Sequence, residues 1–272
     1  MAQQYVLSGN ATATEMFNQR TVNQDAALIV PHLRPGMRLV DFGCGAGSLT
    51  CGFAKLVEPG DVVGFDVSEP AISRARALAE QAGLSNVQFS VANIYDLELP
   101  AESFDVAHFC GVLMYLNEPD RALRLAFESL KSGGMLAARE AVGGNWFGQT
   151  GGSWFAGPCA DSIALALSVA ADWQKASGSD PSVGRRLRGL LREAGFERLE
   201  ATPSYSVALS NVTALATTML STVGRADIRA SAIQSGVTAE RFDRLADEIS
   251  TWAASEDSIA ATAECTVIGW KP

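Results

Sequence analysis

The sequence predicts an α/β fold in which a doubly wound, mostly parallel sheet carries helices on both faces and a further helical insertion. Short apolar runs alternate with helical stretches of about 10–15 residues, a pattern typical of parallel strands joined by crossover helices. A glycine-rich turn directly follows the first apolar run, at residues 37–42. Residues 206–258 are rich in Ala, Thr and Ser with helical spacing, and are too long for a simple connection.

The elements follow in order after a first helix, expected over residues 21–33 and ended by the Pro35-Gly36 turn. Ser68 is expected to cap one helix that Gly83 ends, and Asn117 to cap another. The stretch 143–157 has no regular pattern. The expected strands are residues 37–42, 62–65, 87–91, 104–109, 135–141, 196–205 and 263–270, and the expected helices are residues 48–57, 70–82, 118–130 and 183–194.

These elements divide the chain into three expected parts. Residues 1–35 form an N-terminal helical segment, and residues 36–205 together with 259–272 form the sheet domain. Residues 206–258 form the helical insertion, expected as a cap near the site of the second substrate, the acceptor.

Composition excludes several classes of function. Thirty acidic residues against 21 Lys and Arg give a net charge of −9, which repels nucleic-acid phosphates. Five scattered cysteines with no CxxC pair, and two histidines, favour neither a common zinc site nor a disulfide framework, so we expect no metal. The first residues form no secretion signal, and no apolar run approaches the length of about 20 residues that spans a bilayer. We therefore expect a soluble, cytoplasmic protein.

The segment DFGCGAGS is the most informative part of the sequence. A predicted strand contains Asp41 near its end, and the alternate glycines Gly43, Gly45 and Gly47 follow. Glycine adopts positive φ and lets a ligand approach the backbone closely. This turn belongs to the carboxyl edge of the sheet, where ligands of doubly wound folds bind. The next strand ends in Asp66, whose carboxylate can accept hydrogen bonds from two ribose hydroxyls.

Three interpretations of this segment compete. The turn could simply close a strand–helix unit. It could instead belong to an NAD-type dehydrogenase, but the dinucleotide fingerprint has glycine at its sixth position, where this chain has Ser48. An acid at Asp41 also suits a cation better than a pyrophosphate. The third interpretation is a nucleoside that carries an amino acid and no phosphate, namely S-adenosylmethionine.

In this third interpretation the segment resembles the first motif of class I S-adenosylmethionine-dependent methyltransferases. Residues 90–94, 103–113 and 130–134 resemble that family's later motifs, in the same order. The nearest subgroup resembles the ubiquinone/menaquinone-biosynthesis C-methyltransferases and their small-molecule relatives. The resemblance implies a Rossmann-like sheet of seven strands, S-adenosylmethionine as cofactor and S-adenosylhomocysteine as product. It departs from the family at Asn93, where an Asp is usual.

The resemblance also implies how the cofactor is held. The glycines let its methionine part pass, Asp41 supports its ammonium group directly or through water, and Asp66 binds the ribose. Cys44 fills the turn rather than acting as a reactive thiol. The other implied contacts are Val67 against the adenine, Asn93 and Ile94 at the base edge, and Cys110 and Gly111 near the methionyl group.

Relatives often cover the cofactor with an N-terminal segment, which brings three more residues into consideration. Arg20 could pair with the methionyl carboxylate or be a solvated charge. Tyr5 could close over the site or belong to a frayed terminus. Gln24 belongs to the same segment and is included among the expected cofactor contacts.

Catalytic and acceptor residues are less defined. His108 is either a general base or a hydrogen-bonded core histidine, and Tyr115 either steers the acceptor or packs. Met114 follows the same strand and is expected to face the acceptor. Trp146, Phe147 and Trp154 form either an apolar lid or anchors for an irregular segment.

The sequence therefore predicts methyl transfer to a small, apolar metabolite at carbon or oxygen, by in-line displacement and mainly through positioning. The fourth motif lacks the Asn/Asp-Pro-Pro-aromatic tetrapeptide of enzymes that methylate exocyclic or amide nitrogens. One alternative is a protein that binds S-adenosylmethionine but catalyses a cyclisation or rearrangement. An NAD-type dehydrogenase is the other. A homodimer is left open as the oligomeric state.

Overall fold

One sheet organises the part of the chain that the computed structural model describes, namely residues 20–143, 154–157, 161–176, 178–207 and 212–272. Neighbouring strands follow the order β3-β2-β1-β4-β5-β8, and β7 pairs with β8. The first five of these are parallel, whereas β8 runs antiparallel to β5 and β7. The strands are β1 (Leu39–Phe42), β2 (Val62–Asp66), β3 (Val87–Val91), β4 (Phe104–Cys110), β5 (Leu130–Ala141), β6 (Trp154–Gly157), β7 (Glu197–Val207) and β8 (Ile259–Trp270).

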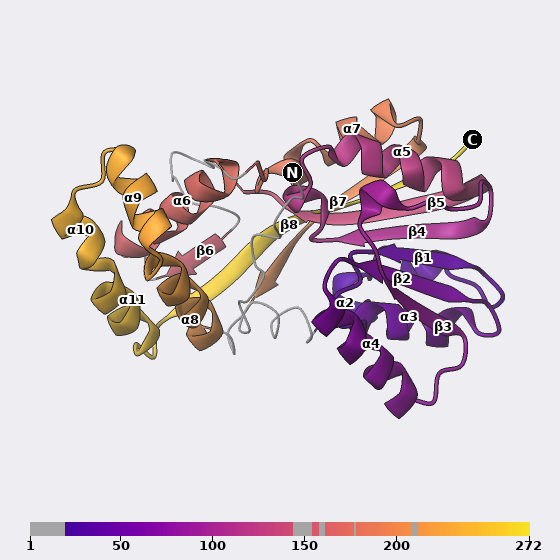
Figure 1. The fold of residues 1–272 in the computed structure, drawn as a ribbon, viewed down its shortest axis with the longest axis horizontal. Coiled ribbons are helices and arrows are strands. Elements are labelled where there is room, and N and C mark those ends of the chain that lie inside the picture. Colours follow the sequence, from indigo (N-terminus) through magenta and orange to yellow (C-terminus); the bar gives the residue numbers. More distant parts are fainter. Residues whose placement is uncertain (1–19, 144–153, 158–160, 177, 208–211) are drawn as a thin grey trace.

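The predicted Rossmann-like sheet of seven strands is confirmed, and β6 adds an eighth strand among the described residues. β6 pairs antiparallel with the first residues of β8, beyond the part of β8 that β5 covers. Because β8 is long, it reaches from the sheet into a separate group of helices (Figure 1).

Helices cover both faces of the sheet, with α3 and α4 on one face and α5 and α7 on the other (Figure 1). None of the helices in the described residues is both long and apolar enough to cross a bilayer. The helices are α2 (Val22–Asp25), α3 (Ser48–Val57), α4 (Glu69–Gln81), α5 (Pro119–Ser129), α6 (Asp161–Ala176), α7 (Leu187–Glu193), α8 (Val212–Val223), α9 (Ala226–Gln234), α10 (Ala239–Asp243) and α11 (Leu245–Ala253). Short 3₁₀ turns are η1 (Val30–His32), η2 (Ile94–Asp96), η3 (Leu113–Tyr115) and η4 (Val183–Arg185).

The two faces of the sheet are separated by the alternation of side chains along each strand. In β1, Leu39 belongs to the core under α3. Its neighbour Val40 belongs to the core under α5 and α7. Phe42 and Phe109 stack on this second face with their ring centroids 4.8 Å apart. Successive side chains of β1 and β4 therefore pack into the cores on opposite faces of the sheet. This alternation determines which side chains meet at the carboxyl edge.

Helix α3 and strand β3 have the predicted bounds, and Ser68 caps α4 by accepting a hydrogen bond from the Ala71 N–H. The single helix expected at residues 21–33 was wrong. Only α2 and η1 form there: α2 already ends at Asp25, and η1 is a separate turn with Pro31 in its first positions, where a missing N–H is tolerated. Asn117 was also wrong as a cap: α5 begins at Pro119, a residue favoured in the first turn of a helix.

Further boundaries differ from expectation. The helix expected at residues 183–194 is divided into η4 and α7. Gly184 of η4 lies so close to β5 that a Cβ atom there would be 2.6 Å from the Ala141 carbonyl oxygen. Strand β5 begins at Leu130 rather than at residue 135, and β8 begins at Ile259 rather than at residue 263.

The helices at the far end of β8 share a core of their own. Ile163 of α6, Leu215 of α8 and Ile249 of α11 are nearly fully buried and pack together. The helices after β7 lie within the expected insertion, whereas α6 precedes it and was not predicted. We propose that the cap comprises α6 and α8–α11.

Candidate active site at the carboxyl edge of the sheet

The glycine turn after β1 leaves open space at its middle residue. Gly43, Gly45 and Gly47 have φ values of 68°, 54° and 80°. A Cβ atom at Gly43 would lie 2.4 Å from a methyl carbon of Val112, and one at Gly47 would lie 2.8 Å from the Cβ of Ala75. At Gly45 a Cβ would meet no atom within 4 Å. The outer glycines are thus required by close packing, and Gly45 borders a space that a ligand can enter.

Asp66 lies at the end of β2, directly across from this opening. One carboxylate oxygen accepts a hydrogen bond from the Gly45 N–H and the other from the Ser68 N–H, both at 2.9 Å. Burial raises the pKa of Asp66 above its usual range. A carboxylate offers about four lone-pair sites, so two remain for two donors from a ligand. Two vicinal hydroxyls, such as those of a ribose, are one pair of donors of this kind.

An apolar surface adjoins Asp66. Val67 is 52% exposed and Val91, at the paired end of β3, is 42% exposed. Asn93 caps η2 by accepting a hydrogen bond from the Tyr95 N–H at 3.1 Å, and Ile94 packs partly into the core. The adenine contacts expected of Val67, Asn93 and Ile94 stay a prediction, and the amide oxygen of Asn93 is already engaged by the backbone.

Asp41 and His108 face each other below the turn, on the α3 face. Nδ1 of His108 lies 2.8 Å from one oxygen of Asp41, and the Thr50 hydroxyl donates to the other oxygen at 2.6 Å. Both side chains are almost fully buried, and the His108 ring packs edge-on against Phe53. Of the two alternatives, a general base or a hydrogen-bonded core histidine, the surroundings of His108 match the core histidine. The partners of Asp41 favour indirect support of a ligand ammonium group over direct contact.

The N-terminal segment lies against the end of β4. Arg20 donates to the Cys110 carbonyl at 3.0 Å and lies 3.2 Å from its sulfur. Its guanidinium also closely approaches Gly111. Arg20, Cys110 and Gly111 therefore lie together at the end of β4. Gln24 is not part of this group, because it is exposed and hydrogen-bonds to Thr21 of its own segment.

A buried charge network below Arg20 was not predicted. Arg139 of β5 is 6% exposed and pairs with Asp25 of α2 at 3.1 Å and with Glu264 of β8. Burial raises the pKa of Glu264. The network joins the N-terminal segment to β5 and β8. In the sequence, the one sign of this network is that charged residues stand at the end of an otherwise apolar strand.

Glu140, the next residue of β5, is the second unpredicted feature, and it faces the opposite side of the sheet. It is fully buried and accepts hydrogen bonds from the backbone N–H groups of Val112, Leu113 and Met114. Burial raises the pKa of Glu140 to about 7. No signal in the sequence connects a residue of β5 with this turn, which lies about 26 positions earlier.

The expected acceptor residues are placed only in part. Met114 is buried and Tyr115 is half-buried, and both pack at the edge of the core under α5 and α7. Trp154 lies in β6, paired with Thr262 of β8. Tyr5, Trp146 and Phe147 lie outside the described residues.

The remaining predicted residue, Cys44, is half-buried with its sulfur close to Gly64. Burial raises the pKa of the Cys44 thiol, so it remains protonated and serves as a filler of the turn. Within the part of the chain that the structure describes, no group of His, Cys, Asp and Glu could hold a metal ion.

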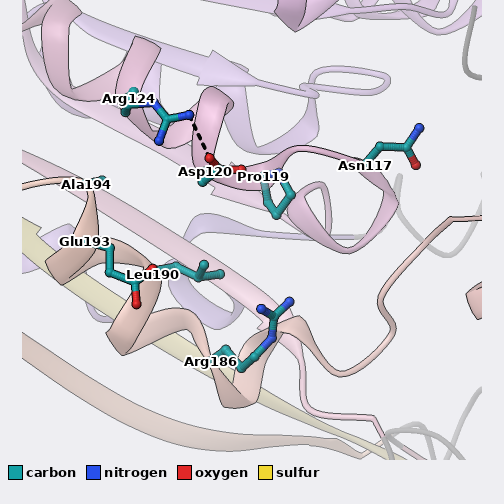
Figure 2. A pocket seen from close by; sticks show the side chains of 8 residues that line it. All are labelled: Asn117, Pro119, Asp120, Arg124, Arg186, Leu190, Glu193 and Ala194. Atoms are coloured by element: carbon teal, nitrogen blue, oxygen red, sulfur yellow. Dashed lines mark hydrogen bonds and ion pairs between the residues drawn. The ribbon is translucent and has the colours of Figure 1, made fainter.

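A polar groove between α5 and α7 lies apart from these residues (Figure 2). Its arginines already have partners, since Arg124 pairs with Asp120 at 2.7 Å and Arg186 pairs with Asp180 at 2.6 Å. It contains none of the residues expected to bind cofactor or acceptor. The groove is lined by Asn117, Pro119, Asp120, Arg124, Arg186, Leu190, Glu193 and Ala194.

Several known proteins have sequences similar to this chain. A family described as a methyltransferase domain matches residues 33–172, which is more than half of the chain. A probable methyltransferase, ltbC, from Aspergillus luteorubrus is 26% identical over 96% of this chain and 95% of its own length. The ubiquinone/menaquinone biosynthesis C-methyltransferase UbiE of Vibrio vulnificus is 35% identical over 39% of this chain and 42% of its own length.

A solved structure shows the same fold. Phosphoethanolamine N-methyltransferase 2 from Haemonchus contortus, in complex with phosphomonomethylethanolamine and S-adenosylhomocysteine, superposes with a TM-score of 0.61 at 15% identity. The match covers 99% of this chain and 58% of the nematode enzyme.

The Rossmann-like sheet and the open glycine turn, together with these relatives, define a class I S-adenosylmethionine-dependent methyltransferase. The chain belongs to the methyltransferase-domain family, and its cofactor is S-adenosylmethionine.

Proposed function

We propose that this enzyme transfers the methyl group of S-adenosylmethionine to a small, apolar metabolite, at a carbon or oxygen atom. The observation that supports this most is the pairing of Asp66 with the open side of Gly45. The carboxylate is set to receive ribose hydroxyls, and the bare backbone at Gly45 leaves room for the methionine part.

The residues at the edge fit the whole cofactor. Val67 and Val91 offer an apolar surface to the adenine. At the other end, Arg20 lies over Cys110 and Gly111, where the guanidinium is within reach of a methionyl carboxylate placed along the turn. The polar and apolar parts of the nucleoside amino acid therefore meet residues of matching chemistry.

Catalysis in this proposal depends mainly on positioning. The bound cofactor supplies a methyl group on a positively charged sulfur, ready for in-line displacement. The chain's own residues hold and orient the two reactants and exclude water. His108 does not act as a base, since Asp41 and Phe53 enclose it and its exposed fraction is 2%. Tyr115 remains the residue that would steer the acceptor.

An apolar acceptor is favoured by the residues that follow β4. Met114 and Tyr115 lie at the carboxyl edge with Val112 and Leu116, and the segment contains no charged side chain. The segment His108-Phe109-Cys110-Gly111 also lacks the prolines of the tetrapeptide expected for transfer to exocyclic or amide nitrogen. The net charge of −9 weighs against a nucleic-acid acceptor. Action on a metabolite of the cytoplasm is part of the same proposal.

The test is a mass-spectrometric search in which enzyme and S-adenosylmethionine are added to a metabolite extract. We expect one metabolite to gain a methylene unit, and S-adenosylhomocysteine to form in equal amount. Asp66→Ala is the matched control and should strongly weaken both signals. A product formed without S-adenosylhomocysteine would instead indicate a cyclisation or rearrangement, and a product that depends on NAD would indicate a dehydrogenase.

A further inference from the structure

The turn after β4 is held by a buried carboxylate from the neighbouring strand. Three consecutive N–H groups, of Val112, Leu113 and Met114, point at the side chain of Glu140, at 2.8, 2.8 and 3.3 Å. They are the donors at the start of η3 that have no partner within that short turn. No side chain of the turn itself caps η3, so this role falls to Glu140.

The same turn is held from two other directions. The Gly111 N–H donates to the Arg139 carbonyl at 2.8 Å, and the Met114 carbonyl accepts from the Asp180 N–H at 2.8 Å. Asp180 is itself fixed by hydrogen bonds from Ser182 and Arg186. These other contacts hold the Gly111 N–H and the Met114 carbonyl, whereas Glu140 holds the N–H groups between them. Loss of Glu140 would therefore free the backbone between the two anchors.

This turn connects the residues expected to meet the cofactor with those expected to meet the acceptor. Cys110 and Gly111 precede it, Tyr115 ends it, and Val112 packs against Gly43 of the glycine turn. A shift of the backbone at Val112 would move the wall of the cofactor path as well as the acceptor side. Small displacements of this kind reduce binding and rate strongly when catalysis depends on alignment.

We propose that Glu140 is a positioning residue of the methyltransferase, whose carboxylate fixes the turn from Gly111 to Tyr115 in the conformation that binds the cofactor and presents the acceptor. This inference rests on the proposed function of the carboxyl edge. A carboxylate suits the task because it is an acceptor at both oxygens, and three donors must be satisfied in a buried place. A glutamine has the same size but turns one of these acceptors into a donor.

The charges around Glu140 define how it responds to protonation. Arg20, from the N-terminal segment, is the charged side chain whose field favours the ionised form, and burial opposes it. Arg139 points to the other face, where Asp25 and Glu264 neutralise it. Cys265 lies opposite on β8, and Asp180 approaches the turn through its backbone N–H. Because Glu140 titrates near pH 7, its influence on cofactor binding should change within the accessible range.

The experiment compares the full-length wild type with Glu140→Gln, using S-adenosylhomocysteine as the probe. Affinity is measured by titration calorimetry from about pH 5.5 to about pH 8.5, and exchange of the amides of residues 112–114 is followed in parallel. We expect Glu140→Gln to bind roughly tenfold more weakly at high pH, a loss of about 1.4 kcal/mol. The ratio of the two affinities should shrink toward one below about pH 7, where the wild-type side chain is itself protonated. Faster exchange should be confined to residues 112–114.

Asp105→Asn is the matched control. Asp105 also accepts a backbone hydrogen bond, from Arg38 at 2.8 Å, but near the start of β4 and so at the opposite edge of the sheet. The Asp105→Asn variant should bind S-adenosylhomocysteine as tightly as the wild type does. Should Glu140→Gln fail to fold, Glu140→Asp replaces it, because the shortened carboxylate cannot reach all three donors and should show faster amide exchange and weaker binding.

The outcomes separate the two levels of the proposal. Unchanged affinity and unchanged exchange in Glu140→Gln, with normal binding by the wild type, would overturn the role of Glu140 alone. A constant affinity ratio at all pH values would overturn it too, since a merely structural defect would not follow the titration. Failure of the wild type to bind the probe would overturn both this inference and the proposed function.

Discussion

Nδ1 of His108 in β4 lies 2.8 Å from a carboxylate oxygen of Asp41 in β1, and the two residues are direct neighbours in the parallel ladder. Both are buried, and Thr50 of α3 satisfies the other oxygen of Asp41. The acid beside the glycine turn therefore ties β1, β4 and α3 together. Its contribution to the site is to hold the strand end from which the turn departs.

His108→Ala should reduce the free energy of unfolding by about 2–4 kcal/mol. The substitution leaves a buried carboxylate with one partner fewer and opens a cavity beside Phe53. His108→Asn keeps a donor near the position of Nδ1 and should recover part of the loss. Urea unfolding curves measure both. A stable His108→Ala protein that binds S-adenosylhomocysteine normally but has lost turnover would show that His108 acts in catalysis after all.

Gly45→Ala should weaken S-adenosylhomocysteine binding by roughly a hundredfold or more while costing only about 1–2 kcal/mol of stability. The φ of 54° strains an alanine, but no protein atom lies within 4 Å of the new methyl group, so the steric conflict arises with the ligand alone. Calorimetric titration and thermal unfolding of the same sample measure the two effects.

Gly36→Ala is the control for that substitution. Gly36 has a φ of 88°, and a Cβ there would also meet no atom within 4 Å, but it lies in the turn before β1. It should show a similar loss of stability and no change in affinity. Equal weakening of the probe by both variants would mean that backbone strain, and not occupation of the ligand space, explains the effect at Gly45.

Lowering the pH from about 7 toward 4.5 should raise the free energy of unfolding, because Glu140 takes up a proton more readily in the folded protein than in the unfolded chain. The pKa of Glu140 is about 7 in the folded protein and returns to its usual 4.5 on unfolding, so the folded state binds the proton more tightly in this window. Stability therefore rises as the pH falls, by at most about 1.4 kcal/mol per pH unit from this group. Urea unfolding at several pH values should show a shallower rise in Glu140→Gln. An identical slope in both proteins would contradict the assignment.

Arg139→Met should be among the most destabilising substitutions, at about 3–5 kcal/mol, because it leaves the buried Glu264 and the half-buried Asp25 without their common partner. Adding Glu264→Gln to Arg139→Met removes one of the unpaired charges and should recover part of the loss. Thermal unfolding of the single and double variants measures the coupling. A double variant less stable than Arg139→Met would contradict this view of the network.

The pattern of the sequence was sufficient to predict the central sheet and its glycine turn. Helix α3 and strand β3 have local signals at both ends, so their bounds could be assigned within the chain itself. Asp66 could be placed because the strand that it ends and the turn that it faces belong to one strand–helix–strand unit.

The contacts that the sequence did not predict all join distant segments. Glu140 meets a turn about 26 positions earlier, and Arg139 joins Asp25 to Glu264. In the sequence these charges stand at the end of an apolar strand, and nothing local indicates which donors or acids will surround them. Helix α6 was missed for a related reason, since its buried face is completed by α8 and α11 from beyond β7.

The central claim is that Asp66 binds the ribose of a sulfonium nucleoside beside Gly45. Calorimetric titration of S-adenosylhomocysteine into the wild type and into Asp66→Ala tests this claim most directly. The account predicts tight saturable binding by the wild type, about a hundredfold loss in the folded variant from two missing charge-assisted hydrogen bonds, and no heat with NAD. Equal affinity in both proteins, or binding of NAD in place of the nucleoside, would contradict it.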